Sequence, residues 1–315
     1  MSGSGTAILP GRGGLFGGLS DQFWRRPNLL LFLMLLPPVL WLGIIYLGAL
    51  FALLAQSFFS IDEFSGLVRY EFTLKTYGEL LRPSNFDIIV RTVTMATLVT
   101  VAAAVVAFPI AYYAARYARG KWKALFYLGV MLPLWSSYLV KIYAWKLILA
   151  KEGILNWVFA KLHLTWLLDA LLAIPIIGGN SLSISYIGTF LVFLYVWLPF
   201  MILPLQAALE RVPATLTEAS SDLGAAPGQT LRHVILPLAM PGMIAGSIFT
   251  FSLTLGDYII PQIIGTSRLF IGQAVYAQQG TAGNIPLAAA FTVVPIVIMG
   301  IYLWLAKRQG AFDAL

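Results

Sequence analysis

The sequence predicts an all-α, polytopic transmembrane helix bundle with about six spans. Of its 315 residues, 59% are hydrophobic and only 10% are charged, whereas soluble domains have about 25% charged residues. That leaves too little polar surface to cover a globule in water. Six apolar runs also approach or exceed the roughly 20 residues that a helix needs to cross a bilayer. Aromatic residues make up 14% of the chain, which is typical of proteins with Trp and Tyr at the membrane interfaces.

The first apolar run extends from about Leu29 to Phe58 and carries no charge. It is far longer than the 7–15-residue core of a cleaved signal peptide, so we expect a spanning helix here. The preceding residues 1–27 are rich in Gly and Ser and are expected to form a disordered tail. The second run covers about Thr92–Ala115 and directly follows Arg91.

The third run, about Ala124–Ala150, contains Lys141 and Lys146. The remaining runs cover about Ile184–Leu209, Leu236–Ile259 and Ala288–Ala306. A weaker apolar stretch, Trp166–Ile177, is short and contains a proline, so an interfacial or re-entrant segment is expected rather than a span. If it did cross, the two ends of the chain would lie on opposite sides.

Basic residues predict the orientation, because Lys and Arg favour the cytoplasmic side. They gather in three segments that share one side in a six-span topology: Arg12, Arg25 and Arg26; Arg116, Arg119, Lys121 and Lys123; and Lys307 and Arg308. Both termini are therefore expected in the cytoplasm, and the loop from Ser60 to Asp87, of mixed charge, is expected outside. The net charge of +7 serves topology and anionic headgroups rather than nucleic acid. We predict one transmembrane domain over residues 28–309, with a C-terminal tail at 310–315.

Residue types exclude several kinds of site. The chain has no cysteine, which rules out disulfides, thiolate metal sites and cysteine nucleophiles. Its two histidines, His163 and His233, are too few and too far apart for a metal centre. The segment "ARGKWKA" around Lys121 lacks the spacing of a phosphate-binding loop. We therefore expect no catalytic residue, metal or cofactor in this chain, and a protein that is not itself an enzyme.

A polar segment, Leu216–Gly242, interrupts the apolar runs on the predicted cytoplasmic side. Thr215 and Glu218 have the spacing of a capping box, which would start a helix. Gly224 would end that helix, and Pro227 would open a second short one. Leu216, Ala219, Ser220 and Leu223 would then share one face, and Pro237 and Pro241 would mark the start of the fifth span.

This segment resembles the cytoplasmic signature of permease subunits of type I ABC importers. The signature is Glu-Ala-Ala, three residues, Gly, nine residues, then Ile-x-Leu-Pro. The chain has Glu218-Ala219-Ser220, Gly224 and Val234-Ile235-Leu236-Pro237 at that spacing, with Ser220 in place of the second Ala and Val234 in place of Ile. The resemblance implies the type I ABC importer permease fold and, at about 210–235, a coupling helix that enters a cleft of the ATP-hydrolysing subunit. It assigns to this coupling Glu218, Ala219, Ser220, Asp222, Gly224, Arg232, Leu236 and Pro237.

Further segments are similar to the spermidine/putrescine branch of that family, and the resemblance covers roughly Leu29–Leu305. They are "FTLKTY" (72–77), "LPLWSSYLVKIYAW" (132–145), "LPFMILPL" (198–205), "LGDYIIPQIIG" (255–265) and "IPLAAA" (285–290). Lys141 stands where arginine is common in the family.

The resemblance implies a set of partners and a location. The expected partners are a second homologous permease, identical or not, two ABC subunits that carry ATP and Mg, an extracytoplasmic substrate-binding protein, and membrane lipid. The expected location is the bacterial cytoplasmic (inner) membrane.

Asp257 is the sharpest candidate for the substrate pathway, with Tyr258 beside it near the outer end of the fifth run. A carboxylate can offset an ammonium group, and aromatic faces add cation–π attraction. The alternative is a carboxylate that is solvated among headgroups or caps a turn. Trp135, Ser136, Ser137, Tyr138 and Tyr143 are candidates for the same pathway, with packing as the alternative.

Three further features of the predicted spans have their own interpretation, and the first bears on the substrate. Lys141 in the pathway would repel a polyamine and favour an anion, so the alternative is that it pairs with a carboxylate or carbonyl between helices or reaches an interface. Gly242 and Gly246 have the spacing of a helix-packing face and need no transport role. Pro109, Pro199 and Pro204 within spans could allow bending.

We therefore predict a permease subunit that carries a small solute by alternating access, driven by a separate ATPase. The predicted substrate is a polyamine or a related organic cation; the alternatives are iron, thiamine or an anion. A secondary transporter would show more paired intramembrane charges, and a membrane enzyme would show a convergent acid, base or metal set. A third alternative is a structural scaffold that transports nothing, and an uptake assay would distinguish it from a permease.

Overall fold

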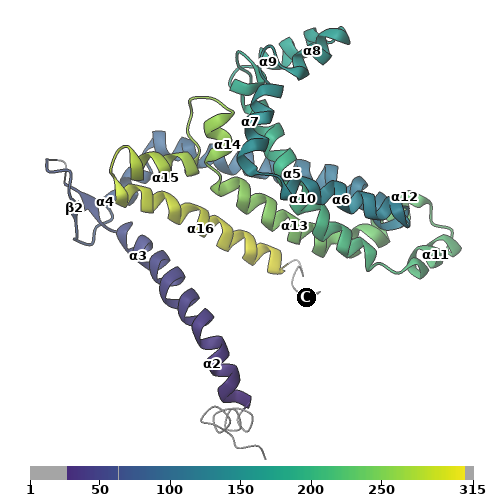
Figure 1. Ribbon diagram of the computed structural model, residues 1–315, viewed down its shortest axis with the longest axis horizontal. Helices are drawn as coiled ribbons and strands as arrows, with labels where there is room; N and C mark the ends of the chain where they lie inside the picture. Colours follow the sequence, from purple (N-terminus) through teal and green to yellow (C-terminus); the bar gives the residue numbers. More distant parts are fainter. Residues whose placement is uncertain (1–26, 63, 309–315) are drawn as a thin grey trace, which may run out of the picture. The chain divides into compact units, whose positions relative to one another are not determined.

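The computed structural model describes residues 27–62 and 64–308, and these residues are mostly helical (Figure 1). The predicted tails, residues 1–27 and 310–315, lie outside the described residues except for Pro27. The chain divides into two units, Met1–Ala55 and Gln56–Leu315, and each is described by itself.

The first unit holds the first predicted span. It consists of α2 (Pro27–Leu40), the π-helical turn η1 (Trp41–Leu47) and α3 (Gly48–Gln56). Pro37 and Pro38 lie inside α2 and remove two backbone donors, and the widened π turn begins three residues later. No side chain of the apolar window within Leu30–Gln56 is buried. A helix that is hydrophobic all round is suited to lipid or to another protein surface.

The second unit is built around three long helices, α5 (Pro83–Arg116), α10 (Tyr186–Glu210) and α13 (Leu236–Gly256). All three pack against one another. α16 (Ile285–Arg308) packs against α13 and α15 (Ile271–Gly280). The side of α5 that faces its neighbours carries small buried residues, which let the helix backbones approach closely; these are Ala96, Ala103, Ala107 and Ala111.

The contact between α13 and α10 confirms the predicted glycine packing face. A Cβ atom added to Gly242 would lie 2.4 Å from the Ala208 Cβ and 2.6 Å from the Pro204 carbonyl oxygen. One added to Gly246 would lie 2.8 Å from the Met201 Sδ. Only glycine leaves room for α10 at these two positions.

The third apolar run, predicted as one candidate span, is not one continuous helix. It forms α6 (Lys121–Trp135) and α7 (Tyr138–Ile148), which meet at an angle of 96°. Ser136 and Ser137 both have extended ψ values, 150° and 130°, so the helical hydrogen bonding stops there. Pro133 adds to the break because it has no N–H to donate within α6.

After the break the chain forms only short elements before α10. They are α8 (Ile154–Lys161), α9 (Thr165–Leu172) and the 3₁₀ turn η2 (Leu182–Ile184). Residues 166–177 thus form most of one short helix and the turns after it. As predicted, they are too short to span a membrane by themselves.

The loop before α5 contains a small hairpin and a short helix. β1 (Ser60–Ile61) pairs antiparallel with β2 (Val68–Arg69), with Ser60 opposite Arg69, and α4 (Lys75–Leu80) follows. The Asp62 carboxylate accepts hydrogen bonds from the backbone N–H groups of Ser65 (3.0 Å) and Phe64 (2.9 Å). These bonds hold the pKa of Asp62 below its ordinary value, because they favour the charged carboxylate.

The polar segment forms α11 (Ala214–Asp222), α12 (Pro227–Thr230) and the π turn η3 (Leu231–Ile235), which continues directly into α13. The helix runs unbroken from Pro227 to Gly256, and its part named α13 begins at Leu236, where the fifth apolar run was predicted to begin. The N–H of Leu236 donates to the Leu231 carbonyl, five residues back. This widened turn accommodates Pro237, which has no N–H of its own. After α13, α14 (Ile259–Ile263) is a single short turn.

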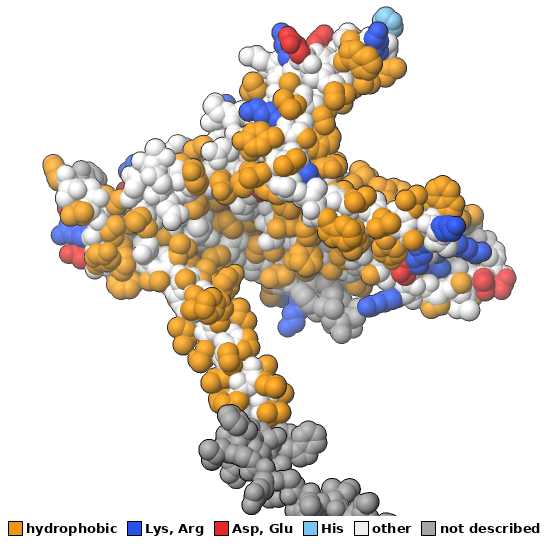
Figure 2. Space-filling model, viewed as in Figure 1, with side chains coloured by type: hydrophobic (Ala, Val, Ile, Leu, Met, Phe, Trp, Pro, Cys, Tyr) orange, Lys and Arg blue, Asp and Glu red, His pale blue; other side chains and the backbone are white. Residues whose placement is uncertain are grey.

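Within the described part of the chain, five helices are long and apolar enough to cross a membrane, or six if α6 and α7 count as one broken span. This agrees with the predicted number. In the second unit, charged side chains gather near α11, at the β1–β2 hairpin and around α8 and α9, and many of the side chains on the surface between them are hydrophobic (Figure 2). Such a distribution is typical of a protein with an apolar membrane belt.

Candidate functional site

Two places in the second unit hold the residues that the sequence singled out. The first is the elbow, defined as residues 213–235, which contains α11, α12 and η3. α11 begins after Pro213, with no side-chain cap. The predicted capping box is therefore wrong: Thr215 lies inside the helix, where it cannot accept from the free N–H groups of the first turn.

The turn of the elbow follows the sequence prediction closely. Gly224 has φ +80°, a conformation that favours glycine, and it follows Leu223, the residue that caps the C-terminal end of α11. Pro227 is the first residue of α12, and the Gln229 side chain accepts a hydrogen bond from the N–H of Ala226 at 2.9 Å. The hydroxyls of Ser220 and Thr230 are 2.9 Å apart and join the two short helices. Ser220 replaces an alanine of the family signature, and its hydroxyl makes a contact between α11 and α12 that alanine could not make.

α11 presents an uncovered face, since none of its residues is buried. Glu218 and Asp222 lie one turn apart, as do Ala219 and Leu223, and all four are exposed. The predicted single face of Leu216, Ala219, Ser220 and Leu223 is therefore divided, because Ser220 packs inward on Thr230. Arg232 is exposed on η3; Leu236 is half-buried and Pro237 exposed at the start of α13. The exposed face and the end of α11 thus offer two carboxylates, Glu218 and Asp222, beside the apolar side chains of Leu216 and Leu223.

The second place is the break between α6 and α7, together with the turn after α13. There the Tyr138 hydroxyl donates a hydrogen bond to the Asp257 carboxylate. The other carboxylate oxygen of Asp257 accepts from the N–H groups of Ile259 (2.7 Å) and Ile260 (3.1 Å). Asp257 therefore caps α14, which is the alternative named from the sequence, while it also contacts a pathway candidate from α7.

Aromatic rings surround this contact. Tyr138 stacks on Trp197 of α10 with ring centroids 5.9 Å apart, and Tyr258 stacks on Tyr276 of α15 at 5.3 Å. We call Tyr138, Trp197 and Asp257 the carboxylate–aromatic cluster. Trp197 was not predicted from the sequence, because it lies in a uniformly apolar run with no polar neighbour to single it out.

The other candidates of this region are placed differently. Trp135 and Tyr143 have exposed side chains, and no described contact joins either to Asp257. The Ser136 hydroxyl donates to the Pro133 carbonyl at 2.9 Å, within the break itself. Ser137 is exposed at the start of α7.

Lys141 fulfils one of its predicted alternatives, a bond to a carbonyl between helices. Its Nζ atom donates to the Pro133 carbonyl oxygen at 2.6 Å. The Pro133 carbonyl has no backbone partner at the end of α6, because the chain turns away at Ser136. Lys141 therefore stabilises the broken span and is not paired with Asp257.

We expect Lys141→Met to lower the stability of the folded protein by about 0.5–1.5 kcal/mol, because the Pro133 carbonyl loses its charged donor but keeps the Ser136 hydroxyl. Thermal unfolding of the purified protein in detergent measures this change. Lys146→Met is the matched control, since Lys146 is exposed on the same helix, and Lys141→Arg should retain most of the stability. Equal melting temperatures for the Lys141→Met and Lys146→Met proteins would contradict the assigned bond.

Comparison with known proteins adds independent findings. Residues 107–310 match the family described as "Binding-protein-dependent transport system inner membrane component". The chain is 58% identical over 306 residues to the inner membrane ABC transporter permease protein YdcU of Escherichia coli (strain K12), covering 97% of each chain. It is 32% identical over 260 residues to the spermidine/putrescine transport system permease protein PotB of the same organism, covering 81% of this chain and 90% of PotB.

The fold also matches a solved structure. A chain from the crystal structure of a bacterial ABC transporter involved in the import of the acidic polysaccharide alginate superposes with a TM-score of 0.69, covering 92% of this chain and 98% of that one. The sequence identity is 16%, so this likeness concerns the fold alone. It agrees with the fold class predicted from the sequence.

Proposed function

The chain belongs to the family of binding-protein-dependent transport system inner membrane components, and we propose that within this family it forms the translocation pathway for a polyamine or a related organic cation. It is a membrane-spanning permease of an ABC importer and not an enzyme; the ATPase is a separate subunit. The single observation that carries the substrate proposal is the carboxylate–aromatic cluster, which combines a carboxylate with aromatic faces.

The chemistry of this cluster suits an organic cation. An ammonium group would be attracted by the Asp257 carboxylate and by the faces of Tyr138 and Trp197. In the conformation described, the carboxylate contacts are all internal, so substrate would exchange for the Tyr138 hydroxyl when the helices rearrange. The similarity to PotB, whose name states spermidine/putrescine transport, supports the same substrate class; the name of YdcU states no substrate.

The proposed mechanism is alternating access driven from the cytoplasmic side. An ATPase subunit docks on the exposed face of α11, and its movement passes through α12 and η3 into α13 because these elements form one continuous helix. Glu218 and Asp222 supply negative charge for a basic cleft. A second permease completes the pathway, and an external binding protein delivers the substrate. Both termini face the cytoplasm, as the basic segments predict.

Asp257→Asn separates the charge of the cluster from its structural role. Asparagine can still cap α14 through its amide oxygen, so the fold should persist. We expect putrescine uptake by cells that depend on this transporter to fall at least tenfold at low substrate concentration, because one charge-assisted contact contributes about 1.5–3 kcal/mol. Uptake of labelled putrescine and the amount of folded protein in the membrane are measured together.

Asp62→Asn is the matched control, because Asp62 also accepts two backbone N–H bonds but lies in the hairpin loop. Its uptake should stay near that of the unmodified protein. Full uptake by a folded Asp257→Asn protein would overturn the role of this carboxylate. If the external binding protein instead prefers an anion such as sulfate over putrescine and spermidine, the substrate class is wrong while the permease assignment stands.

A further inference from the structure

An apolar groove of about 730 Å³ runs along α5, and none of the residues of the carboxylate–aromatic cluster lines it. Its walls come from α5, from the turn at residues 176–177 and from the first part of α10. The side chains that line it are mainly aliphatic or aromatic; they include Leu98, Val101, Val105, Ile176, Ile187 and Phe190. We call this feature the α5 groove.

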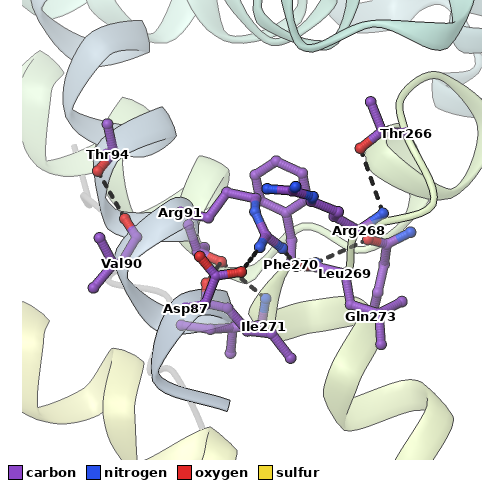
Figure 3. A network of polar contacts seen from close by, with 12 residues as sticks. Asp87, Val90, Arg91, Thr94, Thr266, Arg268, Leu269, Phe270, Ile271 and Gln273 are labelled. Atoms are coloured by element: carbon purple, nitrogen blue, oxygen red, sulfur yellow. Dashed lines mark hydrogen bonds and ion pairs between the residues drawn. The ribbon is translucent and has the colours of Figure 1, made fainter. Parts of the chain in front are cut away.

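One end of the α5 groove carries a net positive charge. Arg91 is 12% exposed; its guanidinium donates to the Leu269 carbonyl oxygen at 2.6 Å and pairs with Asp87. Arg268 also lines this end and is exposed. Figure 3 shows the Arg91 and Arg268 side chains extending toward one another beside the 266–271 loop. Asp87 is the only acidic residue among those that line the groove, so two guanidinium groups face one carboxylate.

The depth of these groups suits a membrane. α5 has 34 residues and is therefore about 51 Å long, against about 30 Å for a hydrocarbon core. Arg91 lies eight residues after Pro83, about 12 Å from the start of the helix. With the hydrocarbon core centred on α5, about 10 Å of the helix would project at each end, which would place Arg91 near the headgroup boundary. The apolar lining continues about 22 Å further to Val106, more than the roughly 15 Å of one leaflet.

We propose that the α5 groove binds an anionic phospholipid, with the phosphate between Arg91 and Arg268 and an acyl chain along Leu98–Val105. The excess positive charge matches the phosphate, since guanidinium groups bind phosphate through paired hydrogen bonds. The apolar walls match the acyl chain of the lipid. A free phosphate ion would leave this apolar part of the groove unoccupied. This inference needs only a membrane-spanning chain and does not depend on the transported substrate.

The test uses the transporter purified with its partner chains, stripped of lipid in detergent and mixed with equal amounts of dioleoylphosphatidylglycerol and dioleoylphosphatidylcholine. Native mass spectrometry then counts the bound lipid. We expect the anionic lipid to be retained about tenfold more, and Arg268→Gln to reduce its retention about tenfold, as for the loss of one charged hydrogen bond. Val101→Trp should displace both lipids, because the exposed Val101 side chain lines the groove.

Arg82→Gln is the matched control, since Arg82 is an exposed cation just before α5 and does not line the groove. It should leave lipid retention unchanged. The proposal is overturned if both lipids bind equally, if Arg82→Gln reduces retention as much as Arg268→Gln, or if neither Arg268→Gln nor Val101→Trp changes it. Displacement of the lipid signal by inorganic phosphate alone would also overturn it. The proposal is also overturned if the assembled transporter retains no lipid because a partner chain occupies the groove.

Discussion

Gly242→Leu is expected to prevent the folded permease from accumulating, and Gly242→Ala to destabilise it by about 2 kcal/mol. The reason is geometric: a Cβ atom at this position would lie 2.4 Å from the Ala208 Cβ and 2.6 Å from a backbone oxygen of α10. Neither neighbour is the free end of a flexible side chain, so the helices must separate. Overpacking of this kind typically costs about 1–3 kcal/mol, and leucine adds three further carbon atoms.

The measurements are the yield of monodisperse protein and its melting temperature in detergent. Gly256→Ala is the control on the same helix, since no atom outside that helix lies within 4 Å of its added Cβ; it should be neutral. Ala208→Gly combined with Gly242→Ala should restore part of the lost stability, because it removes the nearer of the two clashes. Identical melting temperatures for Gly242→Ala and Gly256→Ala would refute the close contact between α10 and α13.

The long helices could be predicted because length and hydrophobicity determine them locally. α10 and α16 begin and end within a few residues of the apolar runs. The turn of the elbow was also predictable, since Gly224 and Pro227 have restricted backbone preferences that act without distant partners.

The break in the third span could not be found from hydrophobicity, because the run is equally apolar on both sides of Ser136. Pro133 was the available signal, but prolines also lie inside α10 without ending it. The break after Pro133 differs from the prolines of α10 in its hydrogen bonds: Lys141 and Ser136 both donate to the Pro133 carbonyl once the chain has turned. Such compensation depends on the folded geometry, and a pattern of residue types does not contain it.

Pairing across the sequence was the other limit. Tyr138 and Asp257 were each candidates for the pathway, yet they are separated by 119 positions and nothing local indicates that they touch. The same holds for Ser220 and Thr230, whose hydroxyls join α11 to α12. Composition identified the residue types, and the tertiary fold determined which of them meet: Asp257 accepts hydrogen bonds both from Tyr138 and from the first N–H groups of α14.

Leu223→Asp is expected to abolish uptake while leaving the permease folded. Leu223 is 89% exposed at the end of α11, so within this chain the change removes almost no buried contact. If an ATPase subunit covers this face, the new carboxylate would be buried against it beside Asp222 and Glu218. Burying an unpaired charge at an interface costs several kcal/mol, so association of the ATPase should weaken by at least a hundredfold.

Co-purification of the ATPase with the permease measures the association, and thermal unfolding of the isolated permease checks its fold. Leu67→Asp is the matched control, since Leu67 is 69% exposed but lies in the hairpin loop, at a distance from the elbow. It should retain the ATPase. A Leu223→Asp permease that still binds the ATPase and transports normally would show that this face of α11 is not the docking surface. The ATPase subunit would then have to contact the permease at another surface, and its movement would have to reach α13 without passing through α11 and α12.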